Sequence, residues 1–290
     1  MNTTLVLYHD NCRDGFGAAL AAWCRFGDTA DYQSVQYGRP APEVAGRDTV
    51  YILDFSFPRD ELLRMAKRVG SVFVIDHHAS AERALAGLEG EAENLYCTFD
   101  MQHSGAVLAW QHFFGDDVPV LLQYIEDRDL WRHALPRSEQ VALGLGCLPQ
   151  TFQSWHEVIG AGNDGIRKLA DAGAAVRQYL DLQIVRLTRN PPRMRLFGHD
   201  VPVLNVPGFL ASDVGNVLSQ GEPFAATYFL TATQMVVSLR SAPEGLDVSR
   251  LAESVGGGGH AHAAGFTLGL VPGDLPLYDG FGAYSVELPA

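Results

Sequence analysis

The sequence predicts an α/β protein with an N-terminal, mostly parallel sheet flanked by helices, a helical linker and a smaller C-terminal α/β domain with a mixed sheet. The first half alternates short apolar runs with segments of helical spacing, and a long amphipathic segment follows. The remainder carries short β-type runs and a glycine cluster. The expected domains are residues 1–162, the linker 163–192, and 193–290.

Three apolar runs of the first half are predicted to be buried strands: Thr4–Tyr8, Val50–Leu53 and Val72–Ile75. The segments Gly17–Phe26 and Arg59–Val69 have helical spacing and follow the first two runs. Strands that alternate with helices form parallel sheets, whose ligands bind at the carboxyl ends of the strands. All three runs end in polar residues, so we expect a site at that edge.

Helical spacing continues over Gln102–Phe114 and Val118–Trp131. Asn163 or Asp164 is suited to cap a helix from about Gly165 to Arg189, which the prolines at 191 and 192 would stop. Its apolar face is expected either to pack internally or to pair two chains, so a monomer and a homodimer both fit. Three β-type runs follow: Pro202–Val206, Ala225–Leu230 and Met235–Leu239.

Composition limits the possible partners of this 290-residue chain. Hydrophobic residues make up 47% of it, which is enough for real cores, and the net charge of −13 disfavours long duplex nucleic acid. A short phosphate ester stays compatible because a bound cation would supply positive charge. The four cysteines form no C-x-x-C pair and no apolar run reaches the roughly 18 residues of a membrane span. We therefore expect a cytoplasmic protein without membrane contact.

The polar residues at the strand ends are the types that bind divalent metals. Asp76, His77 and His78 follow one buried run, Asp54 follows another, and the segment His9–Asp14 follows the first. Mixed carboxylate and imidazole sets favour Mn²⁺, and two ions roughly 3.5 to 4 Å apart can clamp a phosphoryl group. The competing interpretation is that the aspartates cap helices and the histidines fill an interface.

These motifs resemble those of the DHH phosphoesterases, a family named for the triplet found here at Asp76–His78. Further family motifs appear in order: the first loop from His9 to Gly15, Asp54 in ILDFS, and Asp127 in YIEDRDLW. The C-terminal GGGGHAHAAG, Gly256–Gly265, resembles the glycine-rich segment of the DHH-associated domain. The resemblance spans most of the chain.

The resemblance implies two Mn²⁺ ions, with Mg²⁺ or another divalent ion as the alternative. His9 and Asp54 would hold one ion, and Asp54 would bridge to the other. Asp76, His77 and His78 would form the catalytic triplet, in which Asp76 supports a ligand histidine and His78 lies beside the metals. The second ion would be held by Asp14, Asp54, His77 and Asp127.

Two positions of this ligand set are open. The family commonly shows H-x-x-x-D-x-D in the first motif, whereas Cys12 stands here where the first of these aspartates is expected. The corresponding ligand is then the Cys12 thiolate, the Asn11 amide, or absent. Asp129 is the rival of Asp127, since both lie in one acidic turn.

Several residues are candidates for binding substrate. His103 and Ser104 begin a predicted helix whose free amides suit a phosphate, although Ser104 as a simple cap fits equally well. Arg240 is suited to clamp a phosphate oxygen, with a surface charge as the alternative. The glycine run is either a phosphate-binding segment or a flexible loop, and His260 is preferred to His262 as the residue facing the substrate. The run contributes Gly257, Gly258, Gly259 and His260.

The function expected from the resemblance is hydrolysis of a phosphodiester in a short oligoribonucleotide or a linear or cyclic dinucleotide, by a metal-activated water in a cleft between the domains. The first alternative is a phosphoanhydride hydrolase acting on polyphosphate or pyrophosphate. The second alternative is a nucleotide-binding protein with weak catalysis, because the first motif is altered.

Overall fold

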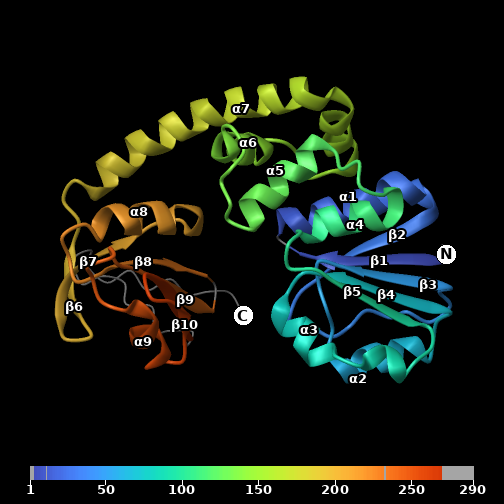
Figure 1. Cartoon of the computed structure of the whole chain (residues 1–290). Coiled ribbons are helices and arrows are strands. Elements are labelled where there is room, and N and C mark those ends of the chain that lie inside the picture. The colour runs from blue at the N-terminus through green and yellow to red at the C-terminus, as the bar shows by residue number, and fades with distance from the viewer. Residues whose placement is uncertain (1–2, 11, 232, 270–290) are drawn as a thin grey trace, which may run out of the picture. The chain divides into compact units, whose positions relative to one another are not determined.

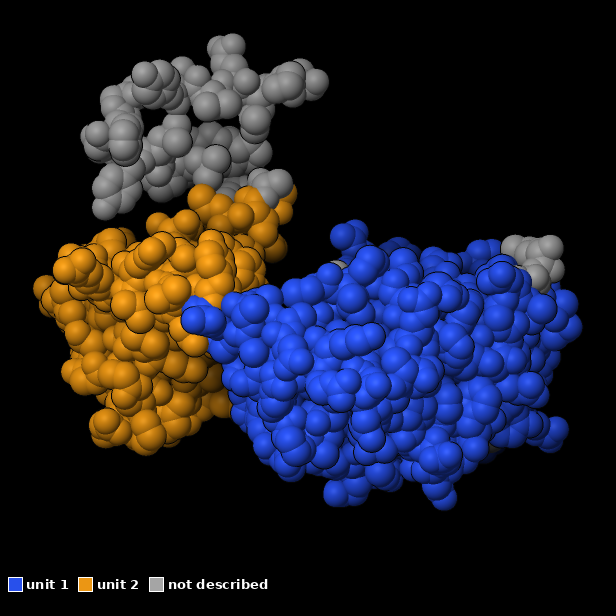
Figure 2. Space-filling view, turned by 90° about the horizontal axis from the view of Figure 1, so that it is seen from above, with its two compact units in different colours: residues 1–178 blue, residues 179–290 orange. Residues whose placement is uncertain are grey.

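The computed structural model describes residues 3–10, 12–231 and 233–269, and the chain forms two compact units, residues 1–178 and 179–290 (Figure 2). Each unit has a β-sheet with helices packed against it. The predicted α/β class is therefore confirmed.

The sheet of the first unit has five parallel strands in the order β2-β1-β3-β4-β5. Its three central strands match the three apolar runs seen in the sequence. The two edge strands, β2 and β5, leave most of their residues partly or fully exposed, and the sequence analysis does not predict them. The strands are β1 (Thr4–His9), β2 (Ala30–Val35), β3 (Thr49–Leu53), β4 (Ser71–Asp76) and β5 (Leu95–Phe99).

Helices cover both faces of this sheet, which explains why its central strands are apolar throughout (Figure 1). On one face, α1 (Arg13–Phe26) and α4 (Gly105–Phe114) cover the sheet and bury side chains such as Val6 and Leu53. On the other face, α2 (Arg59–Ala66) and α3 (Ala79–Leu85) lie over a core that includes Ile52. The alternation of side chains along each strand therefore feeds two separate cores.

A second helical layer packs on the outer side of α1. It consists of α5 (Val120–Asp129), α6 (Ser138–Leu145) and the first part of α7 (Phe152–Thr188), which is interrupted at the non-helical Gly162. Phe16 of α1 stacks against Phe152 and meets the edge of the buried Trp155. This packing holds the first part of α7 against α1. The division between the two units falls within α7.

The second unit has a mixed six-stranded sheet in the order β10-β11-β9-β8-β7-β6. Only the pair β7 and β8 is parallel, and the other neighbouring pairs are antiparallel. Among its described residues, this unit contains the end of α7 and the helices α8 (Ala211–Leu218) and α9 (Val248–Glu253). Its strands are β6 (Arg193–Leu196), β7 (His199–Asn205), β8 (Ala225–Leu230), β9 (Gln234–Arg240), β10 (Gly258–His260) and β11 (Ala263–Gly269).

Among the described residues, none of the helices combines the length and the apolar character that crossing a membrane requires.

Candidate metal centre

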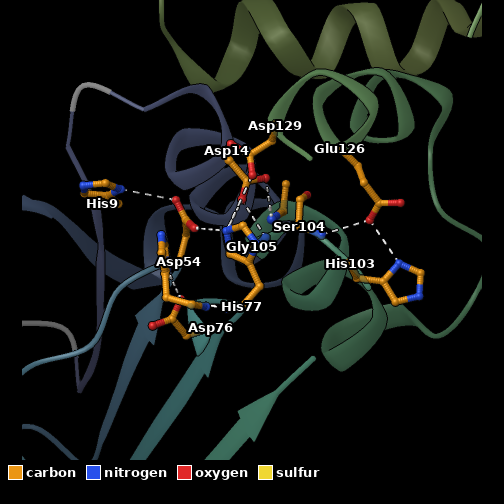
Figure 3. A network of polar contacts seen from close by, with 12 residues as sticks. His9, Asp14, Asp54, Asp76, His77, His103, Ser104, Gly105, Glu126 and Asp129 are labelled. Carbon is orange, nitrogen blue, oxygen red and sulfur yellow. Dashed lines mark hydrogen bonds and ion pairs between the residues drawn. The ribbon is translucent and has the colours of Figure 1, made fainter. Parts of the chain in front are cut away.

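The polar residues that end the three central strands of the first unit converge on one place (Figure 3). His9 ends β1, Asp54 directly follows β3, and His77 follows Asp76, the last residue of β4. Because β1, β3 and β4 are parallel neighbours, their carboxyl ends meet at one edge of the sheet. The N-terminus of α1 and the C-terminus of α5 bring Asp14 and Asp129 to the same place.

Asp54 is held at the centre of this cluster by its backbone. It has φ 53°, the left-handed region that costs a residue other than glycine or asparagine about 1 kcal/mol or more. Its N–H donates to the Ile75 carbonyl at 2.9 Å, and its side chain is 1% exposed. A Cβ atom at Gly105 would lie 2.4 Å from the Asp54 Cβ, so α4 approaches Asp54 as closely as a glycine permits. The strain and the close contact together fix the direction of the carboxylate.

His77 lies among three carboxylates. Its Nε2 atom is 3.1 Å from Asp54 Oδ1 and 3.6 Å from both Asp14 Oδ2 and Asp129 Oδ2. Burial alone would lower the pKa of His77, but the hydrogen bond with Asp54 and the nearby negative charges raise it to about 9. The same pairing acts against the effect of burial on Asp54 and lowers the pKa of Asp54 to about 2. This cluster therefore needs a positive charge, which a proton on His77 or a divalent cation can supply.

The opposite oxygen of Asp54 faces His9. The distance from His9 Nδ1 to Asp54 Oδ2 is 3.5 Å, and both atoms are buried without a hydrogen bond in the described part of the chain. One potential ligand atom each from His9, Cys12 and Asp54 lies within 4.8 Å of the other two. Buried polar atoms normally have a partner, and a cation bound between these two atoms would be that partner. The residues present therefore fit a metal ion.

Cys12 occupies the place where the resemblance leads one to expect an aspartate. Burial and then the charge of Asp54 raise the pKa of the Cys12 thiol to about 12. In the protein alone, the side chain is thus a neutral thiol, and only a bound cation would favour the thiolate. The alternative ligand, Asn11, lies outside the described residues.

Asp14 is bound to the N-terminus of α4 as well as facing His77. Its Oδ2 accepts a hydrogen bond from the Gly105 N–H at 2.6 Å, and its Oδ1 accepts one from the Ala106 N–H at 3.0 Å. These bonds orient the carboxylate without any contribution from a metal.

The N-terminus of α4 is closed by protein side chains, which corrects the expectation of a phosphate site there. Ser104 caps the helix, because its Oγ accepts a hydrogen bond from the Val107 N–H at 3.4 Å. The Ser104 N–H itself donates to Glu126 Oε2 at 2.9 Å, and His103 Nδ1 lies 3.0 Å from the same oxygen. Since these amides and the two that bind Asp14 already have acceptors, none of them is free for a phosphate. The capping interpretation of Ser104 is the one that the contacts support.

Asp76 is fully buried and acts on its neighbours. Its Oδ1 accepts from the His77 N–H at 2.7 Å and lies 2.6 Å from His78 Nδ1, while its Oδ2 accepts from Ser56 Oγ at 2.6 Å. The hydrogen bond with Asp76 raises the pKa of His78. Asp76 therefore orients His78 through its ring and His77 through its backbone.

The structure brings Asp129, rather than Asp127, to the metal cluster. A ligand-type atom of Asp129 groups with those of Asp14 and His77, whereas Asp127 Oδ1 accepts hydrogen bonds from the N–H groups of Ala134 at 2.8 Å and Leu135 at 3.4 Å. Asp127 and Asp129 both lie in the last turn of α5, about 200° apart around the helix axis, so their side chains face different directions. We therefore replace Asp127 with Asp129 in the candidate ligand set.

The expected substrate residues of the second unit lie on β9 and around β10. The Arg240 guanidinium donates to Ser212 Oγ and to the Leu239 carbonyl, both at 2.8 Å, so it is a tethered group of the fold. A Cβ atom at Gly257 would lie 2.3 Å from the Gly265 carbonyl oxygen, and Gly259 has φ 140°. Gly257 and Gly259 are thus required by strand packing, whereas Gly258 borders open space and His260 is exposed.

Comparisons with known proteins agree with this fold. No family model matches the sequence. The uncharacterized protein R106 of Acanthamoeba polyphaga mimivirus is 27% identical over 298 residues, which cover 94% of this chain and 69% of that protein. An exopolyphosphatase-related protein from Bacteroides fragilis superposes with a TM-score of 0.50 and 16% identity, covering 91% of this chain and 86% of the other.

A pGpG-specific phosphodiesterase from Vibrio cholerae, PggH, gives a TM-score of 0.45 at 14% identity, covering 93% of this chain and 94% of the other. The likeness to the Bacteroides fragilis protein shows a shared fold, which supports the DHH-type fold that the motifs indicate.

Proposed function

We propose that this protein is a divalent-metal-dependent phosphoesterase. The observation that carries the proposal is the convergence of three carboxylates and two imidazoles, with His9 Nδ1 and Asp54 Oδ2 buried and without a hydrogen bond to any described residue. A set of oxygen and imidazole ligands suits Mn²⁺, with Mg²⁺ or another divalent ion as the alternative. In the proposed set, Asp129 takes the place first assigned to Asp127.

The two oxygens of Asp54 suggest how two cations would be held. Oδ1 faces His77 and Oδ2 faces His9, so Asp54 is the proposed bridging ligand. The first ion would be held by His9 and Asp54, with Cys12 as the third candidate ligand. The second ion would be held by Asp14, Asp54, His77 and Asp129. When bound, such ions polarise phosphoryl oxygens and lower the pKa of a nearby water.

Asp76 and His78 are the proposed positioning and proton-transfer residues. Because Asp76 engages His78 at Nδ1, the other ring nitrogen of His78 is the one available to a substrate. A histidine held in this way is suited to contact a phosphate oxygen or to move a proton. Ser56 in turn fixes Asp76 through its hydroxyl.

We propose a short oligoribonucleotide or a dinucleotide as the substrate. The Tyr37 ring, with the residue 55% exposed, lies with its centroid 5.5 Å from that of His9 and 4.3 Å from that of Phe55. Nucleobases stack on exposed aromatic rings of this kind, and a polyphosphate makes no use of one. Arg240 and the segment 257–260 remain proposed substrate-binding residues, with Gly258 and His260 the best placed to reach a ligand.

A phosphoanhydride hydrolase is the second candidate, because the Bacteroides fragilis protein that shares the fold is described as exopolyphosphatase-related. The same ligand residues would serve a phosphoanhydride bond as well as a phosphodiester. Hydrolysis assays on both types of substrate distinguish the two candidates.

The test is hydrolysis by EDTA-treated protein to which Mn²⁺ or Mg²⁺ is returned. A 5′-phosphorylated diadenylate, a short RNA and a polyphosphate would be compared, with release of 5′-mononucleotide or of phosphate as the readout. Metal-dependent mononucleotide release supports the proposal, whereas phosphate release from polyphosphate alone supports the second candidate. Tight nucleotide binding without product would instead indicate a nucleotide-binding protein with weak catalysis, and no metal-dependent reaction with any compound would refute the proposed enzyme.

A further inference from the structure

The two proposed cation positions differ in the chemical type of one ligand. Among the residues that the structure describes, one group of ligand-type atoms contains a sulfur, that of Cys12, together with atoms of His9 and Asp54. The other groups, which lie around His77, contain carboxylates and imidazoles alone. Sulfur is a soft ligand and favours other metals than oxygen does. The two positions are therefore chemically distinct.

The packing of α1 against β1 brings the Cys12 thiol close to His9. His9 is the last residue of β1, and Cys12 directly precedes α1 in an extended conformation with φ −119° and ψ 134°. A Cβ atom at Gly15 would lie 2.3 Å from the His9 carbonyl oxygen and 2.8 Å from the His9 Cβ atom. The first turn of α1 thus touches the end of β1 as closely as a glycine permits. The backbone therefore determines that the thiol and the imidazole are neighbours.

Neither helix capping nor core packing explains a cysteine at this position. Cys12 is the N-cap residue of α1, where serine, threonine, aspartate and asparagine are favoured because their side-chain oxygens accept hydrogen bonds from the helix amides. The Cys12 side chain is a free, partly exposed thiol. A residue that is poorly suited to the cap and lies outside the core is explained better as a ligand.

The two residues beside Cys12 provide independent evidence for a cation. Asp54 is 1% exposed, and its Oδ2 lies 3.5 Å from His9 Nδ1, with no hydrogen bond from either atom to any described residue (Figure 3). Together with Cys12 they offer one oxygen, one nitrogen and one sulfur, with their ligand atoms within 4.8 Å of one another. Zinc takes these three ligand types, and zinc sites of enzymes have three protein ligands and one open position. Mn²⁺ and Mg²⁺ prefer sets rich in oxygen.

A cavity next to Cys12 gives an ion room to reach the thiol. Cys12 borders a hollow of about 250 Å³ that is also lined by Leu145, Leu148 and Trp155. A hollow of this size holds several water molecules, so an ion can enter it with part of its hydration shell. A metal site requires such an entry path.

We propose that the position formed by His9, Cys12 and Asp54 binds Zn²⁺ through the Cys12 thiolate. The thiol proton leaves to the solvent when the ion binds. The position around His77 has oxygen and nitrogen ligands and suits Mn²⁺, so the centre is built for two different metals. Mn²⁺ alone fills the position beside Cys12 at a higher concentration than Zn²⁺ does. The inference rests on the proposed function, because it assigns the metals of the same centre.

The first test detects the metal–sulfur bond and does not depend on turnover. Co²⁺, which occupies zinc sites and can be followed by its absorption, would be titrated into EDTA-treated protein. We expect the near-ultraviolet charge-transfer band of a sulfur–cobalt bond in the wild type, and no such band in Cys12→Ser or Cys12→Asp. Serine and aspartate are both good N-cap residues, so α1 should form in each variant. Cys24→Ser removes another free, partly exposed thiol of α1 and is the matched control, which should keep the band.

The second test measures selectivity as the change in affinity for each metal. Zn²⁺ and Mn²⁺ would be titrated separately, in competition with a chelator, into the wild type, Cys12→Asp and Cys24→Ser. In Cys12→Asp the tightest Zn²⁺ affinity should fall by about a hundredfold, since the loss of an outer-shell partner alone costs about 10- to 100-fold. The Mn²⁺ affinity of this variant should stay the same or rise, because a carboxylate replaces the sulfur. Cys24→Ser should bind both metals like the wild type.

The outcomes separate this inference from the proposed enzyme. A wild type that binds Co²⁺ without the sulfur–cobalt band, or a band that persists in Cys12→Ser, would overturn the thiolate ligand, while Mn²⁺-dependent hydrolysis would still support the enzyme. An equal loss of Zn²⁺ and Mn²⁺ affinity in Cys12→Asp would overturn the selectivity. A wild type with the band and the selective change in affinity, but with no metal-dependent hydrolysis of any phosphate compound, would refute the enzyme and support the zinc position.

Discussion

Two carboxylate clusters lie on either side of the N-terminus of α4, and they differ in how their charge is balanced (Figure 3). On one side, Glu126 is matched by Arg132 at 2.7 Å, by the Ser104 N–H and by His103. On the other side, three aspartates surround His77, and Asp54 Oδ2 has no hydrogen bond in the described part of the chain. The first network is complete within the protein. The second needs a positive charge, which a proton on His77 or a divalent cation can supply, and we therefore propose it, and not the first, as the site of chemistry.

The largest expected effect comes from neutralising the central aspartate. Asp54→Asn keeps the size of the side chain and suits the left-handed backbone, but it removes the charge between the two imidazoles. We expect Mn²⁺-dependent kcat/KM to fall by about a thousandfold or more and the bound-metal stoichiometry to drop. Rates within tenfold of the wild type, with metal still bound, would contradict the claim that the cluster around His77 needs its charge for catalysis and differs in this from the cluster around Glu126.

The next largest effect distinguishes the two aspartates of α5. Asp129→Asn should weaken Mn²⁺ binding and lower the rate by about a hundredfold, because its carboxylate faces His77. Asp127→Asn should leave metal affinity unchanged and cost about 1–3 kcal/mol of unfolding free energy, because Asp127 accepts two backbone hydrogen bonds. Metal titration and urea unfolding of both variants would check this. The reverse pattern would restore Asp127 to the ligand set.

A change in the cluster around Glu126, whose charge is matched within the protein, should lower the stability of the protein and leave its activity unchanged. Glu126→Gln removes the charge that pairs with Arg132 and His103, so we expect a loss of about 1–3 kcal/mol in unfolding free energy. Since Glu126 does not face the metal cluster, the saturating rate at 25 °C should stay close to that of the wild type. A large fall in rate without loss of stability would show that the two clusters act as one.

The smallest expected effect concerns the pH dependence of the metal-free protein. The folded pKa of His77 is about 9, above its ordinary value of 6.5, so its contribution to stability is complete below pH 6.5 and is lost as the pH rises through 9. The raised pKa of buried Asp14, due first to burial and then to Asp54, acts in the same direction. Thermal unfolding of EDTA-treated protein should therefore become easier over this range. Added Mn²⁺ should flatten the dependence, because it replaces the proton.

Much of the fold could be predicted because central strands and long helices have strong patterns. Strands β1, β3 and β4 are buried on both faces, so they appear as uninterrupted apolar runs. Strands β2 and β5 lie at the edges and expose side chains, and therefore their sequences resemble loops. The short helix α6 was missed for a similar reason, since it has only eight residues and contains a glycine.

The candidate site could be predicted only for those residues whose position in the sequence already determines where they lie in the fold. Residues at the ends of neighbouring parallel strands must meet, and the sequence places His9, Asp54 and His77 there. The choice between Asp127 and Asp129 depends on the rotation of α5 against α1, which is set by packing far along the chain. Glu126 directly precedes Asp127 in the same acidic turn, but its role at α4 depends on a contact 22 residues away in sequence, to the Ser104 N–H.

One carboxylate side chain presents its two oxygens to two different imidazoles, Oδ1 to His77 and Oδ2 to His9. Occupancy of the two proposed cation positions is then thermodynamically linked, because charge drawn to one oxygen is no longer available at the other. The position beside Cys12 has fewer charged ligands and should fill second. Metal would then bind in two steps at two different free metal concentrations. Activity would rise with the second step, at the higher concentration.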